Sequence, residues 1–198
     1  MGPDQLAEVV RALRGGAVVG IPTDTVYGLA ASLDHRAAVR RLSELKGREA
    51  EQPVALLIDS LETVAPHLDE PAALEAVRRF WPGPLTVIVR AREGFAAEVA
   101  NATGGIGLRQ PDDRLALAVI AACGGVLAVT SANRHGEPPA TTAREVVGIF
   151  GGDLLVLDGG PRTGGVASTV VDLSVDPPRV LREGPISVEA LGLARPEA

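Results

Sequence analysis

Short apolar runs, each bounded by glycine, proline or polar residues, recur along the chain and alternate with longer segments of helical periodicity. A bounded run of four to eight apolar residues is typical of a buried strand, and the longer pattern is typical of an amphipathic helix. The alternation is irregular. We therefore expect an α/β fold, in which a twisted sheet of mixed parallel and antiparallel strands carries helices on its faces.

The patterns predict where most elements lie. The expected strands are residues 17–21, 54–58, 85–90, 106–109, 126–130, 154–157, 168–173 and 179–182. The expected helices are residues 4–14, 34–45, 71–80, 112–123 and 142–150. Residues 26–33 are apolar and fit a strand or a short helix equally well. Asp34 is expected to cap the second helix, and Gly124-Gly125 to end the fourth.

Composition narrows the class of protein. Hydrophobic residues make up 46% of the 198 residues but aromatic residues only 3%, so the core must consist mainly of Val, Leu, Ile and Ala. Cys123 is the one cysteine, which excludes an intramolecular disulfide and a cysteine-rich zinc site. No apolar run approaches the ~18 residues of a membrane span, and no signal peptide is evident. We expect a cytoplasmic protein without a membrane partner.

Charge argues against one class of partner. The net charge is −6 and the pI about 5.1, whereas proteins that bind nucleic acids on their own usually have a basic face. Tight, non-specific RNA binding is therefore disfavoured, although a local basic cleft is compatible with this balance. Lys46 is the only lysine among 19 basic residues. A compact ammonium group binds differently from a planar guanidinium, so Lys46 is a candidate functional residue.

Several familiar catalytic motifs are absent from the sequence. It contains no G-x-x-x-x-G-K-[ST] phosphate loop, no G-x-G-x-x-G after an expected strand and no G-x-S-x-G nucleophile turn. The histidines His35, His67 and His135 stand in polar or loop segments without the spacing of metal ligands. An enzyme built from this chain would work by positioning and charge neutralisation rather than through a covalent nucleophile.

Four short segments instead place hydroxyl, amide or cationic groups at loops and strand ends. They are residues 22–28 (Pro-Thr-Asp-Thr-Val-Tyr-Gly), 46–48 (Lys-Gly-Arg), 130–133 (Thr-Ser-Ala-Asn), and 167–172 followed by 180–184. Open α/β sheets bind ligands beside strand ends, and such groups suit phosphates and carboxylates. Taken singly, each segment also fits an ordinary turn, strand or helix end. Their combination is the informative feature.

These segments occur in one fixed order along the chain, together with the motifs Pro-Gly-Pro-Leu-Thr, Leu-Arg-x-Pro and Leu-Arg-x-Gly. The whole pattern, over residues 16–191, resembles the YrdC family of threonylcarbamoyl-adenylate synthases. The resemblance implies one YrdC-like domain over residues 1–198, with its core at about 8–191 and a sheet that encloses a large, positively lined cavity. It implies a nucleotidyltransferase that makes L-threonylcarbamoyl-adenylate from L-threonine, bicarbonate and ATP with Mg²⁺, releasing pyrophosphate. A tRNA threonylcarbamoyl transferase complex would then modify adenosine 37 of ANN-reading tRNAs.

The resemblance also implies roles for individual residues. The expected catalytic residues are Lys46, Arg48, Ser131 and Asn133. The expected ATP-binding residues are Lys46, Arg48, Gln52, Asn133, Thr141 and Arg182. The expected threonine-binding residues are Thr25, Arg109, Ser131 and Ser168, with Arg109 pairing the carboxylate. No residue is expected to bind a metal directly. The sequence departs from the family pattern at Glu49, where a proline is usual, and at Leu57, which is often histidine in members with an extra C-terminal domain.

Two other functions fit parts of the same pattern. One is a non-catalytic YrdC-like module that binds RNA in its cavity, and the other is a carbamoyl transferase acting through carbamoyl-adenylate. The complete set of cations with Ser-x-Asn favours the synthase over the RNA-binding module, as does the acidic pI. A weak contact with tRNA remains compatible with a local basic cleft. Carbamoyl transferase domains of this kind normally belong to much larger chains.

Overall fold

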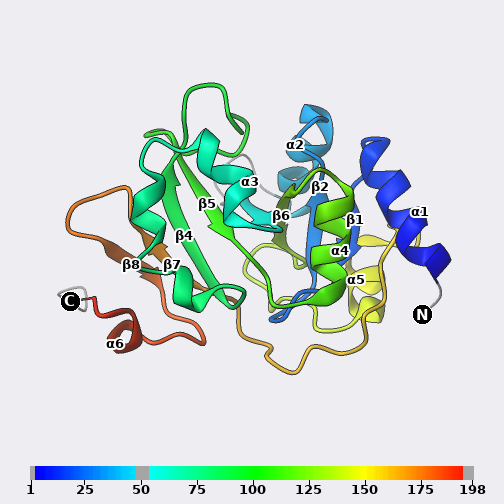
Figure 1. The fold of residues 1–198 in the computed structure, drawn as a ribbon. Coiled ribbons are helices and arrows are strands. Elements are labelled where there is room, and N and C mark those ends of the chain that lie inside the picture. Colours follow the sequence, from blue (N-terminus) through cyan, green and yellow to red (C-terminus); the bar gives the residue numbers. More distant parts are fainter. Residues whose placement is uncertain (1–2, 48–53, 194–198) are drawn as a thin grey trace.

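The computed structural model describes residues 3–47 and 54–193, in which eight strands form one mixed sheet with helices packed around it (Figure 1). The strand order is β1-β2-β6-β3-β5-β4-β7-β8. The strands are β1 (Val19–Ile21), β2 (Gly28–Ala31), β3 (Ala55–Ile58), β4 (Leu85–Arg90), β5 (Gly105–Arg109), β6 (Val126–Ser131), β7 (Thr169–Asp172) and β8 (Arg179–Arg182). β3 pairs with β5, and β4 with β7, in parallel; the other neighbours are antiparallel. The expected mixed sheet is confirmed.

The helices differ widely in length. The α-helices are α1 (Pro3–Arg14), α2 (Arg36–Leu45), α3 (Leu61–Val64), α4 (Arg114–Ala122), α5 (Ala143–Phe150) and α6 (Val188–Leu191). Three short 3₁₀ helices are η1 (Ala65–His67), η2 (Pro71–Leu74) and η3 (Arg78–Phe80). In Figure 1 the sheet extends from β8 and β7 on the left to β2 and β1 on the right, beside α1. None of the helices in the described part of the chain has the length and hydrophobicity to cross a bilayer.

Buried aliphatic side chains form two clusters. β2 contributes to both, because Leu29 and Ala31 belong to the larger cluster and Ala30 to the smaller one. Successive side chains of a strand point to opposite faces, so the two clusters cover the two faces of the sheet here. α2 packs into the larger cluster, whereas α1 and α4 pack into the smaller one. As the composition predicts, Val, Leu, Ile and Ala dominate both.

Three predictions about local structure are wrong. Residues 71–80 form η2 and η3 rather than one helix. Residues 154–157 make a single parallel bridge, Gly20 with Val156, instead of a strand. Asp34 does not cap α2: the helix begins at Arg36, His35 holds the N-cap position, and the backbone N–H of Asp34 donates to the Ser32 hydroxyl. The four-residue helices α3 and α6 are too short to show a periodicity and were not predicted.

Candidate functional site

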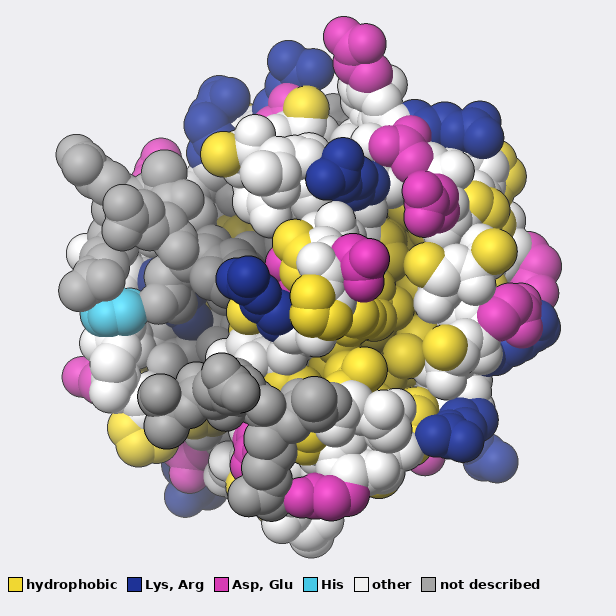
Figure 2. Space-filling model, turned by 90° about the vertical axis from the view of Figure 1, so that its left-hand side faces the viewer, with side chains coloured by type: hydrophobic (Ala, Val, Ile, Leu, Met, Phe, Trp, Pro, Cys, Tyr) yellow, Lys and Arg dark blue, Asp and Glu magenta, His cyan; other side chains and the backbone are white. Residues whose placement is uncertain are grey.

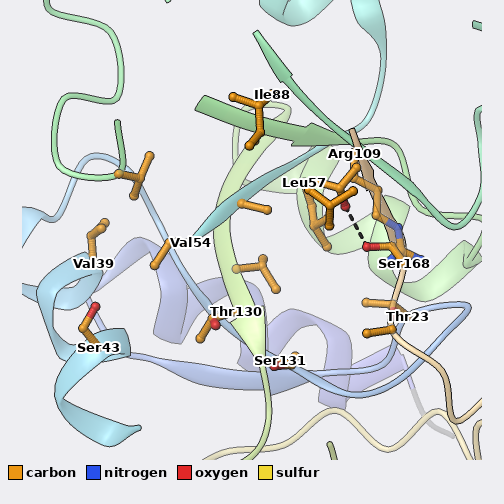
Figure 3. A pocket seen from close by; sticks show the side chains of 18 of the residues that line it. Thr23, Val39, Ser43, Val54, Leu57, Ile88, Arg109, Thr130, Ser131 and Ser168 are labelled. Carbon is orange, nitrogen blue, oxygen red and sulfur yellow. Dashed lines mark hydrogen bonds between the residues drawn. The ribbon is translucent and has the colours of Figure 1, made fainter. Parts of the chain in front are cut away.

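A pocket of about 1410 Å³ lies against the sheet and opens to solvent. Five of the residues expected to bind substrates line it: Thr25, Arg109, Ser131, Ser168 and Arg182. In Figure 3, Arg109, Ser168 and Thr23 lie on one side of the pocket, and Val39 and Ser43 of α2 lie on the other. On the face shown in Figure 2, hydrophobic side chains gather in a hollowed area with Lys and Arg side chains around it.

The charge of the pocket wall is mixed. Among the described residues, its charged members are Arg40, Arg109 and Arg182 together with Glu44 and Glu98. The excess of positive charge is small, and the pocket is open on one side. The large, positively lined cavity enclosed by the sheet, which the resemblance implies, therefore stays a prediction.

Arg109 stands at the end of β5 with its guanidinium group almost fully buried. Nη1 donates to Thr25 Oγ1 at 3.1 Å, Nη2 to Asp24 Oδ1 at 2.6 Å, and Nε to the carbonyl of Gly83 at 3.1 Å. Burial lowers the pKa of Arg109 and the Asp24 carboxylate opposes this, so the guanidinium remains charged. The structure thus brings Thr25 and Arg109 together as expected.

Asp24 is a functional candidate that the sequence analysis did not assign. Its carboxylate already pairs with the guanidinium that was expected to hold the carboxylate of threonine. A guanidinium has five N–H donors, and the three bonds described above leave two for a ligand. A bound carboxylate would therefore share Arg109 with Asp24. The segment Pro-Thr-Asp-Thr could have indicated Asp24, because this residue lies between two threonines that line the same pocket.

A second group of polar side chains surrounds Ser168 at the start of β7. The hydroxyls of Thr86 and Ser168 are 2.8 Å apart. Arg182 donates to the Ser168 carbonyl through Nε at 3.0 Å and to its hydroxyl through Nη2 at 3.3 Å. Burial lowers the pKa of Arg182. Arg182, expected beside ATP, therefore contacts a residue of the expected threonine group. Thr86 was overlooked, although it belongs to the Pro-Gly-Pro-Leu-Thr motif.

Lys46 occupies the C-cap position of α2 and is only 3% exposed. Its Nζ donates to the Ser131 carbonyl at 2.9 Å, the Ser131 hydroxyl at 3.0 Å and Asn133 Oδ1 at 2.8 Å. The Ser131 hydroxyl also donates to Asn133 Oδ1 at 2.6 Å. Burial lowers the pKa of the Lys46 ammonium to about 8. The structure brings these three residues together, and the three N–H donors of Lys46 are all directed at protein oxygens.

Of the expected ATP-binding residues, Arg182 alone lines the pocket among the described residues, and Lys46 and Asn133 adjoin it through their hydrogen bonds to Ser131. Thr141 does not line it among the described residues, and its hydroxyl donates to Glu145 Oε2 at 3.1 Å beside the cap of α5. That helix begins with a capping box formed by Thr142 and Glu145. Arg48 and Gln52 lie outside the described residues, as does Glu49, so their roles stay predictions.

The chemistry of the described residues does not provide a metal centre. Nowhere in residues 3–47 and 54–193 do three or more His, Cys, Asp or Glu side chains gather as metal ligands. The residues present therefore do not form a cage for the expected Mg²⁺, which binds mainly to phosphate oxygens and water in nucleotide enzymes.

Comparisons with known proteins identify the family to which the chain is similar. A family model described as "Telomere recombination" (Sua5/YciO/YrdC) matches residues 11–184. A putative threonylcarbamoyl-AMP synthase of Mycobacterium leprae is 39% identical, over 96% of this chain and 91% of the relative. The threonylcarbamoyl-AMP synthase of Pyrococcus abyssi is 38% identical over 90% of this chain but only 54% of its own length. The structure of P. abyssi Sua5 with L-threonine superimposes with a TM-score of 0.88 and 34% identity, covering 96% of this chain and 58% of Sua5.

Proposed function

The chain belongs to the Sua5/YciO/YrdC family, and we propose that it is an enzyme that makes L-threonylcarbamoyl-adenylate from L-threonine, bicarbonate and ATP with release of pyrophosphate. The observation that carries the proposal is the convergence of two groups on one pocket region. One group is Arg109, Thr25 and Ser168, which all line the pocket, and the other is Ser131, which also lines it and is hydrogen-bonded to Lys46 and Asn133. The similarity to a relative whose structure contains threonine favours catalysis over a non-catalytic RNA-binding module.

The Arg109 side of the pocket would hold threonine. A buried guanidinium with two remaining N–H donors suits a carboxylate, and the neighbouring hydroxyls of Thr25 and Ser168 suit the polar groups of an amino acid. Fixed in this way, the amine could combine with CO₂ derived from bicarbonate and form a carbamate. Burial beside Leu57 and Thr86 would limit the access of water to this labile species.

The Lys46 side would hold the phosphates of ATP. A carbamate oxygen would form a bond to the α-phosphorus, the bond from that phosphorus to the bridging oxygen would break, and pyrophosphate would leave with the electron pair. Such a transfer needs charge neutralisation more than a protein base. To touch a phosphate, Lys46 Nζ must exchange one of its bonds to Ser131 or Asn133 for a phosphate oxygen. A phosphate that extends toward Ser168 would meet a second cation, Arg182, which also lines the pocket.

Finer parts of the function are proposed on the family relationship alone. The reaction class would be nucleotidyl transfer, because an adenylyl group moves from ATP to the carbamate. The adenylate would pass to a tRNA threonylcarbamoyl transferase complex acting on adenosine 37 in the cytoplasm, with at most weak direct contact with tRNA. The acidic balance of the chain supports that last point.

A pyrophosphate-release assay tests the proposal. The purified chain should release pyrophosphate from ATP only when threonine and bicarbonate are both present, and a threonylcarbamoyl adenylate should appear by mass spectrometry. L-valine, which has a similar shape but no hydroxyl, is the matched control substrate. Release that is independent of threonine, or absent altogether, would contradict the synthase. Release with carbamoyl phosphate in place of threonine and bicarbonate would favour the carbamoyl transferase.

A further inference from the structure

A buried ion pair lies outside the pocket and has no part in the chemistry proposed above. Arg162 Nη1 is 2.7 Å from Asp113 Oδ2, and the two side chains are only 14% and 12% exposed. Neither residue lines the pocket. A largely buried pair of opposite charges is costly to desolvate, so its value to the protein is expected to be more than a small gain in stability.

Asp113 fixes the connection that follows β5. Its Oδ1 accepts hydrogen bonds from the backbone N–H groups of Leu115 and Ala116, both at 2.9 Å, and so caps α4. Its Oδ2 is therefore left for Arg162. Asp113 stands four residues after Arg109, the guanidinium expected to bind the threonine carboxylate. The position of Asp113 thus constrains the path of the chain that follows Arg109.

Arg162 joins that connection to the loop that carries Thr25. Its Nη1 also donates to the Thr23 carbonyl at 3.2 Å, Nε donates to the Gly160 carbonyl at 3.3 Å, and Nη2 donates to the carbonyl of Gly159. The guanidinium carbon lies 5.9 Å from the centre of the Tyr27 ring. One planar group therefore contacts both ends of the segment that runs from Thr23 to Tyr27.

The chain that follows Arg162 lies against the same loop before it reaches β7. A Cβ atom added to Gly164 would lie 3.5 Å from the carbonyl oxygen of Thr25, which is ordinary van der Waals contact. Four residues later the chain arrives at Ser168, which lines the pocket. The same stretch of backbone therefore packs on the loop of Thr25 and delivers Ser168.

We propose that Arg162 and Asp113 are a positioning pair, which holds the three segments that carry the expected threonine-binding residues at fixed distances from one another. Those segments carry Thr25, Arg109 and Ser168. A guanidinium suits this role because its rigid, planar fork donates from three nitrogen atoms in fixed directions, whereas an ammonium donates from a single atom on a flexible stem. The inference rests on the proposed function, since it assigns the pair to the threonine side of the pocket and not to the ATP side.

The test compares variants of the pair with a matched exposed arginine. Arg162→Met removes every donor, Arg162→Lys keeps the charge without the fork, and Asp113→Asn keeps a helix cap but removes the negative charge. Arg78→Met is the control, because Arg78 makes only exposed ion pairs, with Glu62 at 3.6 Å and Glu75 at 3.3 Å. KM for threonine, KM for ATP and kcat are measured by pyrophosphate release.

A positioning role predicts a selective effect. Arg162→Met should raise KM for threonine by about ten- to a hundredfold, because misplacement by ~1 Å is costly in a preorganised site, and should leave KM for ATP within about twofold. Arg162→Lys and Asp113→Asn should raise KM for threonine in the same direction, and Arg78→Met should change neither constant. An unchanged KM for threonine in a folded Arg162→Met or Asp113→Asn protein would overturn the proposal, as would equal increases for both substrates.

A second measurement does not depend on activity. Amide hydrogen exchange of residues 23–27 and 115–117, whose backbone N–H groups are hydrogen-bonded at these two segments, should accelerate together in Arg162→Lys, which retains the charge and is expected to fold. Unchanged protection of these segments would overturn the positioning role. If the wild-type protein releases no pyrophosphate with threonine, the proposed function fails, while the exchange result still decides whether the pair holds these segments.

Discussion

Lys46 offers a titration that no other ammonium side chain obscures, because it is the only lysine of the chain. Its burial lowers its pKa to about 8, from an ordinary value of 10.5. The perturbation is a rise in pH from 7 to 11. The reference is Lys46→Met, which fills a similar volume and cannot titrate. The three oxygen atoms that face Nζ lose their donor in this variant at every pH, so that loss does not contribute to a pH-dependent difference.

The sign and size of the effect follow from linkage. Between pH 8 and 10.5 the unfolded chain binds the lysine proton and the folded chain does not, so the free energy of unfolding rises with pH. The contribution of Lys46 is fully present above pH 10.5 and is lost as the pH falls through 8. Since one pKa unit corresponds to about 1.4 kcal/mol, the wild type should gain about 3 kcal/mol over Lys46→Met across this window.

Two measurements check this expectation. Urea unfolding of both proteins at intervals from pH 7 to 11 gives the difference between their free energies of unfolding. The contributions of titrating groups that both proteins share, such as Tyr27 and Cys123, cancel in this difference. Carbon-13 NMR of protein labelled at lysine Cε should show one signal with a midpoint near pH 8. Parallel stability curves, or a midpoint near 10.5, would refute the reasoning. They would mean that Ser131 and Asn133 stabilise the ammonium as well as water does.

Three further predictions concern binding and stability. Arg109→Met should raise KM for threonine about 100-fold and spare KM for ATP, because a buried charged contact is lost; equal effects on both substrates in the pyrophosphate assay would contradict this. Gly28→Ala should cost about 1–3 kcal/mol in urea unfolding, because the new Cβ would lie 2.7 Å from Val129 Cγ1; wild-type stability would show that the neighbour yields freely. Thr142→Ala should cost about 1 kcal/mol of thermal stability through loss of the helix cap, and Thr142→Ser, the control, should not.

The fold was predictable where local pattern and tertiary structure agree. Strand β4 begins and ends where the sequence predicts, because the apolar run 85–90 follows a proline-glycine turn and needs no distant information. Residues 71–80 show why other segments failed. Their apolar spacing fits a helix, but Pro71 begins a short 3₁₀ turn and a second turn follows, and periodicity does not separate 3₁₀ from α-helix over so few residues.

The site was predictable as a set of residues but not as a set of contacts. The resemblance named Lys46, Ser131 and Asn133, and the structure brings them within hydrogen-bonding distance. The pairing of Asp24 with Arg109 could not be foreseen, because it joins positions 85 residues apart. Such contacts depend on the order in which the strands lie in the sheet. The local patterns of hydrophobic and polar residues do not predict that order.

The strand order also has a consequence for how the protein is made. β7 lies beside β4, so the part of the pocket wall that bears Ser168 and Arg182 is completed by segments that are synthesised well after Thr25 and Arg109. A nascent chain halted before residue 168 would hold Thr25 and Arg109 but lack the neighbouring Ser168 and Arg182. The pocket is therefore complete only after β8 has been synthesised.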